Sequence, residues 1–249
     1  DGQMLRDADG FGAPSPGSSA YYWRNPLTMF LAYAYSKNAY VKSEFIKQGG
    51  SKTIEPYLFL LLNSPEIKPN PNHNLPLTID FGDVSGSMIA RTGWDSHDDV
   101  LVEIKGGGFR NGAHQHPDAG AIQLYYRGFQ FGDIGQYHFS GTPYDINFNR
   151  RSISHSTVLV YNPKENFGAG MENDGGQRFN RPFPKTPEEA QITSNYNNGK
   201  VVSASFGPSS KNPVFSYFSA DISATYSSKV RSFVRSFCFI NTNRKDIPG

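Results

Sequence analysis

A change in hydrophobic period between residues 64 and 76 constrains the fold of this chain more than any other sequence feature. Before it, apolar residues recur at the spacing of one helix face, and after it they alternate with polar residues as in half-buried strands. The stretch itself, SPEIKPNPNHNLP, is rich in proline, which ends helices and favours an extended backbone in the residue before it. We interpret it as an inter-domain linker and predict two domains, residues 1–66 and residues 67–249.

The first territory, residues 20–63, is predicted to be helical. In NPLTMFLAYAYSKN, Asn25 can cap a helix and Pro26 suits its first position. The apolar residues then follow at i, i+3, i+4 and i+7, namely Leu27, Phe30, Leu31 and Ala34. AYVKSEFIKQGG and TIEPYLFLLLN predict two more short helices. Three short helices cannot form a domain of their own, so we expect them to pack against something else.

The second territory has the period-two pattern of strands. The alternating runs are DDVLVEIKG, AIQLYYRG, STVLVYN and KVRSFVRSFCFI, and they are separated by segments rich in Gly, Asn and Pro. Strands at this spacing without βαβ units favour an antiparallel sandwich or barrel. We therefore predict a mainly β fold, an antiparallel β-sandwich preceded by a short helical segment.

Composition limits the classes of function. Charged residues make up 18% of the chain without a long run of like charge, so neither a disordered tail nor a nucleic-acid arm is expected. No apolar stretch reaches the roughly 20 residues of a membrane helix, and no signal peptide is recognised. The sequence does not begin with Met, so we expect a processed chain or a fragment. The one cysteine, Cys238, lies in an alternating run and is expected to be a buried strand thiol.

Histidines are concentrated in NGAHQHPDAG, residues 111–120. Residues i and i+2 of an extended segment point to the same side, so His114 and His116 can project into one pocket. Asp133 follows the apolar run FQF, and His155 precedes the predicted strand STVLV. Two imidazoles and a carboxylate, with one position left for water or substrate, would make a reasonable zinc shell. From spacing alone a metal site, a catalytic site and a hydrogen-bonded polar turn remain open.

Other residues could line the same cleft. Tyr144 lies in the turn SGTPYDINF, and Tyr137 and His138 lie in QYHF. Arg91, in MIARTGW, is a candidate for binding an anion, although an arginine beside a tryptophan is often stacked structure. We name Arg91, Tyr137 and His138 as substrate-binding candidates. For any one tyrosine, packing with a bonded hydroxyl is the competing interpretation.

Two longer stretches together resemble the heparinase II/III-like polysaccharide lyases. They are MIARTGWDSHDDVLVEIKGGGFRNGAHQHPDAGAIQLYYRGFQFGDIGQYHFSGTPYD and RRSISHSTVLVYNP. They contain His-x-His-x-Asp-x-Gly, then Gly-Asp-x-Gly, then Ser-His before a valine-rich strand, in the order typical of the family. KGGG, HQH and DIGQYH are most similar to heparinase II. In this family an α/α toroid precedes an antiparallel β-sandwich, so the resemblance implies that residues 1–66 are the end of a toroid.

The resemblance also implies roles for individual residues. His116, Asp133 and His155 match the positions that hold zinc in the heparinase II type. His114 matches a catalytic histidine of the cleft, and Tyr144 matches a tyrosine that takes part in proton transfer. The implied reaction is β-elimination at a uronic acid, the work of a carbon–oxygen lyase. Its implied substrate is an anionic polysaccharide such as heparin or heparan sulfate.

The family resemblance extends to the setting of the protein. It implies a bacterial periplasmic or secreted protein that can pair as a homodimer, with neither nucleic acid nor membrane as a partner. The family's catalytic residues from the toroid have no recognisable counterpart in this sequence.

Two alternatives are kept. His116, Asp118 and His155 also spell the two-histidine, one-carboxylate set that suits ferrous iron in a cupin-like oxygenase. Alternatively, the sandwich is a non-catalytic glycan-binding module.

Overall fold

The computed structural model describes most of the chain and divides it into two compact units, with the division between Leu75 and Pro76. The predicted boundary between residues 66 and 67 stays a prediction. The described residues are 26–47, 49–52, 54–70, 75–95, 97–109, 114–135, 139–168, 170–178 and 183–244.

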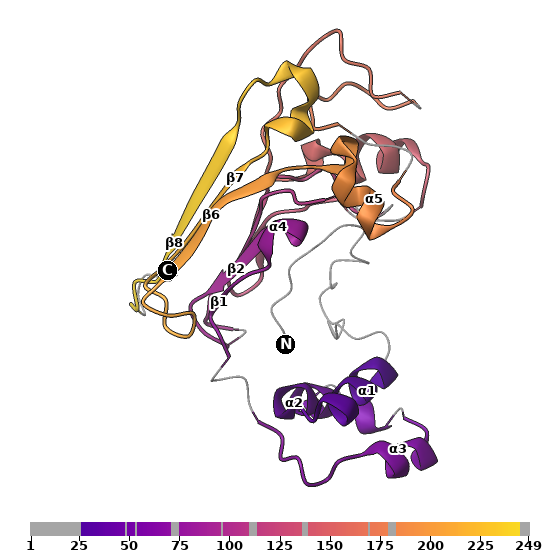
Figure 1. Ribbon diagram of the computed structural model, residues 1–249, viewed down its shortest axis with the longest axis vertical. Coiled ribbons are helices and arrows are strands. Elements are labelled where there is room, and N and C mark those ends of the chain that lie inside the picture. The colour runs from indigo at the N-terminus through magenta and orange to yellow at the C-terminus, as the bar shows by residue number, and fades with distance from the viewer. Residues whose placement is uncertain are drawn as a thin grey trace. The chain divides into compact units, whose positions relative to one another are not determined.

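The first unit consists of short helices, as predicted (Figure 1). They are α1 (Pro26–Ser36), α2 (Ala39–Lys47), the 3₁₀ turn η1 (Gly50–Lys52) and α3 (Pro56–Leu62). Phe30, Tyr33 and Phe45 form the centre of a small aromatic core, with the ring centroid of Phe30 5.4 Å from that of Tyr33. In the described residues, no helix is both long and apolar enough to cross a bilayer.

The buried face of α1 differs in part from the predicted one. Phe30 and Ala34 are buried as expected, but Leu27 is exposed and Met29 and Tyr33 are buried instead. The face is rotated because Tyr33 packs against Phe30 and donates a hydrogen bond from its hydroxyl to Oδ1 of Asn63 at 2.8 Å.

The second unit contains two antiparallel sheets. The first has the order β1-β2-β3-β4-β5, and the second has the order β6-β7-β8. The strands are β1 (Thr78–Asp80), β2 (Ser87–Arg91), β3 (Leu101–Lys105), β4 (Ile122–Tyr125), β5 (Phe129–Phe131), β6 (Lys200–Gly207), β7 (Phe215–Asp221) and β8 (Val234–Ile240). Between them lie α4 (Gly82–Ser85), α5 (Pro187–Ile192) and short turns η3 (Asp145–Asn149), η4 (Ser152–Ser154), η5 (Ser194–Tyr196) and η6 (Ser223–Lys229).

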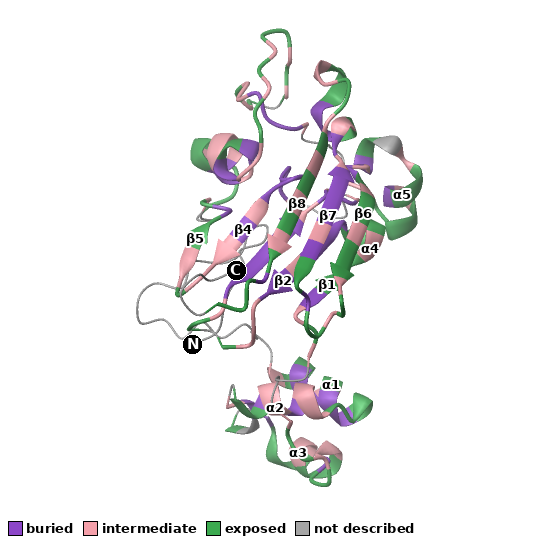
Figure 2. Ribbon diagram, turned by 90° about the vertical axis from the view of Figure 1, so that its left-hand side faces the viewer, coloured by how far each residue is buried: buried purple, intermediate pink, exposed green. Residues whose placement is uncertain are grey.

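The two sheets pack face to face (Figures 1 and 2). Met88, Val102 and Ile104 of the first sheet share one buried cluster with Phe218 and Ala220 of β7. Met88 is the cross-strand partner of Ile104, so alternate residues of adjacent strands face the same core. The predicted antiparallel β-sandwich preceded by short helices is therefore confirmed.

The segment STVLVYN does not form the predicted strand. Its polar backbone groups find partners outside a ladder: Val160 N–H donates to the carbonyl of Gly175 at 2.8 Å, and the Tyr226 hydroxyl donates to the carbonyl of Val158 at 2.5 Å. Because these bonds satisfy the backbone, the segment needs no strand partner despite its alternating pattern.

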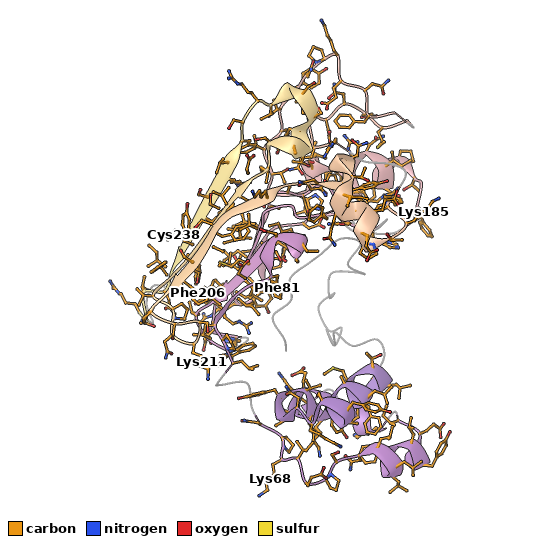
Figure 3. The ribbon with its side chains drawn as sticks, in the orientation of Figure 1. Lys68, Phe81, Lys185, Phe206, Lys211 and Cys238 are labelled. Atoms are coloured by element: carbon orange, nitrogen blue, oxygen red, sulfur yellow. The ribbon has the colours of Figure 1, made fainter. Side chains whose placement is uncertain are left out.

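Cys238 is exposed, so the prediction of a buried thiol was wrong. Phe237 and Phe239 pack against the core of the sandwich. Since neighbouring residues of a strand point to opposite faces, the residue between them points outward. Figure 3 labels Cys238 on β8, in the second sheet.

Candidate metal centre

His116 lies in the long connection between β3 and β4 and is buried. The connection is closed at its base, where Gly120 N–H donates to the carbonyl of Lys105 at 2.7 Å. Gly120 has φ of +80°, and a Cβ there would lie 2.7 Å from Cδ1 of Ile222. Only glycine readily adopts this positive φ and also leaves room for the side chain of Ile222. This explains why glycine is the last residue of His-x-His-x-Asp-x-Gly.

The glycines before this loop also permit close approach. A Cβ at Gly107 would lie 2.3 Å from the carbonyl oxygen of Asn198, and one at Gly106 would lie 2.7 Å from Cβ of Ala220. These contacts bring the start of the loop against the second sheet.

A buried glutamine holds the far side of the His116 loop. Oε1 of Gln177 accepts from Ala119 N–H at 2.9 Å, and its Nε2 donates to the Ala119 carbonyl at 2.6 Å. Oγ of Ser152 donates to the carbonyl of Pro117 at 2.7 Å and accepts from Gln177 N–H at 2.9 Å. These bonds fix the loop against the segment that carries His155. Sequence reasoning missed Gln177, which lies 58 residues from Ala119 without a local signal.

His155 follows the 3₁₀ turn η4, and its ring orientation is set by the backbone. Its Nδ1 lies 2.8 Å from the carbonyl oxygen of Arg151. A carbonyl only accepts, so Nδ1 carries the proton and Nε2 presents its lone pair in the neutral ring. A fixed tautomer of this kind is what a metal-binding histidine requires.

Asp133 follows β5 and faces both histidines. Its Oδ1 accepts from Gly135 N–H at 2.9 Å, which leaves Oδ2 directed at the rings. Oδ2 lies 3.1 Å from Nε2 of His155 and 3.4 Å from Nδ1 of His116. The same two nitrogens are 3.1 Å apart, and the rings are nearly perpendicular, at 87°.

Three atoms that can each accept a hydrogen bond thus converge in a buried site. His116, Asp133 and His155 are all buried, and their ligand atoms lie within 4.8 Å of one another. A single proton on Nδ1 of His116 cannot lie between all three pairs of these atoms. A cation at their centre would attract all three atoms. The residues predicted as metal ligands are therefore brought together in an arrangement that can hold a metal ion.

The two nearby aspartates have different partners. Burial raises the pKa of Asp133, but the adjacent imidazoles of His116 and His155 outweigh this effect and hold the pKa well below its usual range. Asp118 is paired with Nζ of Lys105 at 2.5 Å. Burial also raises the pKa of Asp118, but the charge of Lys105, with smaller contributions from the histidines, keeps it below its usual value. Asp118 therefore supports the loop, and the ligand set of the oxygenase alternative is disfavoured.

The predicted catalytic residues lie outside this buried cluster. His114 is exposed, whereas His116, two residues on, is buried. Tyr144 is 42% exposed and immediately precedes the π-helical turn η3, with its ring centroid 5.5 Å from that of Phe148. The roles of His114 and Tyr144 stay predictions.

Of the three substrate-binding candidates, only Arg91 lies in the described residues. Arg91 is buried at the end of β2 with its guanidinium 3.9 Å from the ring centroid of Trp94. Burial lowers its pKa to about 10, although the charge of Asp99 acts in the opposite direction. This position favours the stacked, structural interpretation of Arg91. Tyr137 and His138 lie outside the described residues.

Comparison with known proteins gives a fold likeness and nothing closer. No family model and no curated protein matches the sequence. A solved structure of heparinase III with methylated lysines superposes on 86% of this chain and 25% of its own, with 16% identity and a TM-score of 0.50. The fold is heparinase-like. A crystal structure of the heparan sulfate lyase HepC from Pedobacter heparinus matches 87% of this chain and 26% of its own, at 16% identity and a TM-score of 0.47. The chain thus spans about a quarter of the length of these structures.

Proposed function

We propose that this chain is the carboxy-terminal part of a polysaccharide lyase of the heparinase II/III-like kind, with its site closest to the heparinase II type. The observation that carries the proposal is the convergence of His116, Asp133 and His155 within a heparinase-like fold. The resemblance of their sequence motifs to this family predicted that the same three residues would lie together. In this proposal the helices of the first unit are the end of an α/α toroid.

We further propose zinc as the metal. Tetrahedral zinc with ligands at about 2.0–2.1 Å places its ligand atoms roughly 3.3–3.4 Å apart. The three separations here are 3.1, 3.1 and 3.4 Å, which supports a site of that size. When bound, the metal would supply the positive charge that joins the His116 loop to Asp133 and His155. Its role in the proposal is structural, because the loop it fixes also carries the exposed His114.

The proposed reaction is β-elimination at a uronic acid. A base removes the C5 proton, the bond from C4 to its oxygen breaks, and that oxygen takes up a proton. The products are an unsaturated uronate and a chain that ends in a new hydroxyl. The neighbouring carboxylate opposes loss of that proton, so a group must offset its charge as electrons move toward it. His114 is proposed to do this by donating from its imidazole, and Tyr144 to transfer the proton. Both residues are exposed, as contact with a polymer requires.

The substrate would be an anionic polysaccharide such as heparin or heparan sulfate, and the protein would be periplasmic or secreted and paired as a homodimer. Tyr137 and His138 would contact substrate.

The decisive experiment measures the ultraviolet absorbance of new unsaturated uronate from heparin and heparan sulfate. It compares this chain with the full open reading frame that encodes it. We expect product from the longer protein, and a loss of at least about 100-fold in kcat for His114→Ala and Tyr144→Phe. Heparin with its carboxyl groups reduced to alcohols is the control substrate and should not be cleaved. Absence of product from the longer protein on every uronic-acid polysaccharide, or equal cleavage of the reduced heparin, would refute the proposal.

A further inference from the structure

The turn that carries Tyr144 is closed by one buried carboxylate, that of Asp145. Its Oδ2 accepts from Gly141 N–H at 2.8 Å and from Nη2 of Arg150 at 2.6 Å. Its Oδ1 accepts from Nδ2 of Asn149 at 3.2 Å. The bonds to Gly141 and Arg150 lie on opposite sides of Tyr144 in the sequence. Asp145 therefore fixes the entrance and the exit of the turn together.

The turn is connected to His155 through Ser154. Oγ of Ser154 shares its proton between the carbonyls of Asn149, at 3.0 Å, and Arg151, at 2.9 Å, and it lies 3.0 Å from Nδ1 of His155. Asn149 and Ser154 are each about 1% exposed. The exit of the Tyr144 turn thus lies one side chain away from the ring that would bind the metal.

A second connection runs to Asp133. Gly135, whose N–H donates to Oδ1 of Asp133, packs directly on Asn149. A Cβ at Gly135 would lie 2.7 Å from Oδ1 and 2.8 Å from the carbonyl oxygen of Asn149. Two of the three candidate ligands are therefore connected to the same asparagine, His155 through Ser154 and Asp133 through the close packing of Gly135.

The local backbone also points to a function of this turn. Residues Asp145–Asn149 form a π-helix, a rare form that is frequent at functional sites. Such a wide turn persists only when surrounding contacts determine it, and the buried pair of Asp145 and Arg150 supplies those contacts. The residue presented just before this turn is the exposed Tyr144.

We infer that Asp145 and Asn149 are positioning residues that link the metal centre to Tyr144, so that a bound metal orders residues 141–150. This inference rests on the proposed function for its use of Tyr144 and of a metal. It adds that the centre acts on the tyrosine turn as well as on the His114 loop. Restraint of His155 and Asp133 by a metal would limit the motions of Asn149, and through it those of Asp145.

The test is hydrogen–deuterium exchange of the full-length protein, with zinc and with a chelator. In the wild type, zinc should slow exchange in peptides covering residues 141–150 by at least about 10-fold. Asn149→Ala should lose that slowing while zinc binding, measured by calorimetry, is retained within about 10-fold. Asn147→Ala is the matched control: it lies in the same π-helix, but its Oδ1 accepts from Glu172 N–H, away from the centre. That variant should keep the slowing.

A second variant guards against misfolding of the first. Asp145→Asn keeps the shape of the side chain and weakens its bond to Arg150, so it should also lose the zinc-dependent slowing. In the lyase assay, both variants should lower kcat by about 10-fold and leave KM unchanged, as expected when a group needed in the transition state is misplaced.

The outcomes separate this inference from the proposed function. Zinc that binds to the wild type without changing exchange in residues 141–150 overturns the inference and leaves the lyase proposal standing. Slowing that persists in both Asn149→Ala and Asp145→Asn overturns it as well. A calorimetric result without zinc binding to the wild type overturns the metal part of the proposed function, and the inference with it.

Discussion

The Oδ2 atom of Asp133 lies 3.1 Å from Nε2 of His155, and both side chains are almost completely buried. Because Nδ1 of His155 donates to the carbonyl of Arg151, the neutral ring turns a lone pair toward that carboxylate oxygen. Two acceptors at this distance repel each other unless a proton or a cation lies between them. The pair therefore favours a bound cation, and Nδ1 of His116 is a third candidate ligand atom at similar distances.

Replacement of Asp133 by Asn tests this ligand set. The amide lacks the charge that attracts a divalent cation, so zinc affinity should fall by more than the roughly 10- to 100-fold cost of losing an outer partner of a ligand. Competition with a chelator of known affinity measures the change. Asp118→Asn is the control. Because Asp118 pairs with Lys105, this substitution should lower zinc affinity by at most about 10-fold. A larger loss from Asp118→Asn would instead favour the oxygenase ligand set.

Removal of the metal should lower stability and activity together. A ligand present at 100 times its Kd stabilises the folded state by about 2.7 kcal/mol, so a chelator should lower the Tm by several degrees. His116→Ala should show a low Tm that zinc does not raise. Thermal unfolding followed by circular dichroism, with and without zinc, measures both. If the metal-free protein kept its Tm and lost only turnover, the metal would act in the chemistry and the structural role would be wrong.

The three candidate ligands could be named from the sequence because each lies in a short motif that resembles the heparinase II/III-like family. His116 is followed by the glycine that closes its loop, and Asp133 follows the strand β5. Their mutual distances could not be predicted, since the bonds that set them join residues far apart. Gln177 is the clearest case, because its two bonds to Ala119 depend on folding across 58 residues.

The sandwich itself was predictable from the alternating pattern, with instructive failures. In STVLVYN only Val160 packs against the core of the sandwich, whereas Val158 and Leu159 are exposed. The hydrogen bonds of its backbone go to Gly175 and Tyr226. In β8 the alternating pattern correctly predicted a strand, but it did not show which face is buried. The larger side chains, Phe237 and Phe239, pack against the core, and Cys238 is exposed. Hydrophobic period thus predicts that a strand has two faces, and packing volume decides which face is buried.

Gln177→Leu should destabilise the second unit. Leucine has a similar size but leaves both the N–H and the carbonyl of Ala119 without their partner, at about 1–3 kcal/mol for each buried group. Urea unfolding should show a free energy of unfolding lower by about 2–6 kcal/mol. Gln130→Leu is the matched control, because this exposed glutamine donates to the carbonyls of Tyr126 and Gly128 in contact with water. Equal losses in the two variants would contradict the role of Gln177.

The ion pair of Arg151 and Asp174 should matter far more for stability than for metal binding. Nη2 of Arg151 lies 2.5 Å from Oδ1 of Asp174, with the two side chains 1% and 8% exposed. Arg151→Met leaves a buried carboxylate without its cation, which costs about 3–5 kcal/mol, and addition of Asp174→Asn should restore part of the loss. The backbone carbonyl that orients His155 is unchanged in Arg151→Met, so zinc affinity should fall by less than about 10-fold in the protein that remains folded. Arg127→Met is the control, because its pair with Asp98 is largely exposed and should leave the urea midpoint unchanged. A loss of zinc affinity as large as that of Asp133→Asn would show that the Arg151 side chain acts on the metal centre directly.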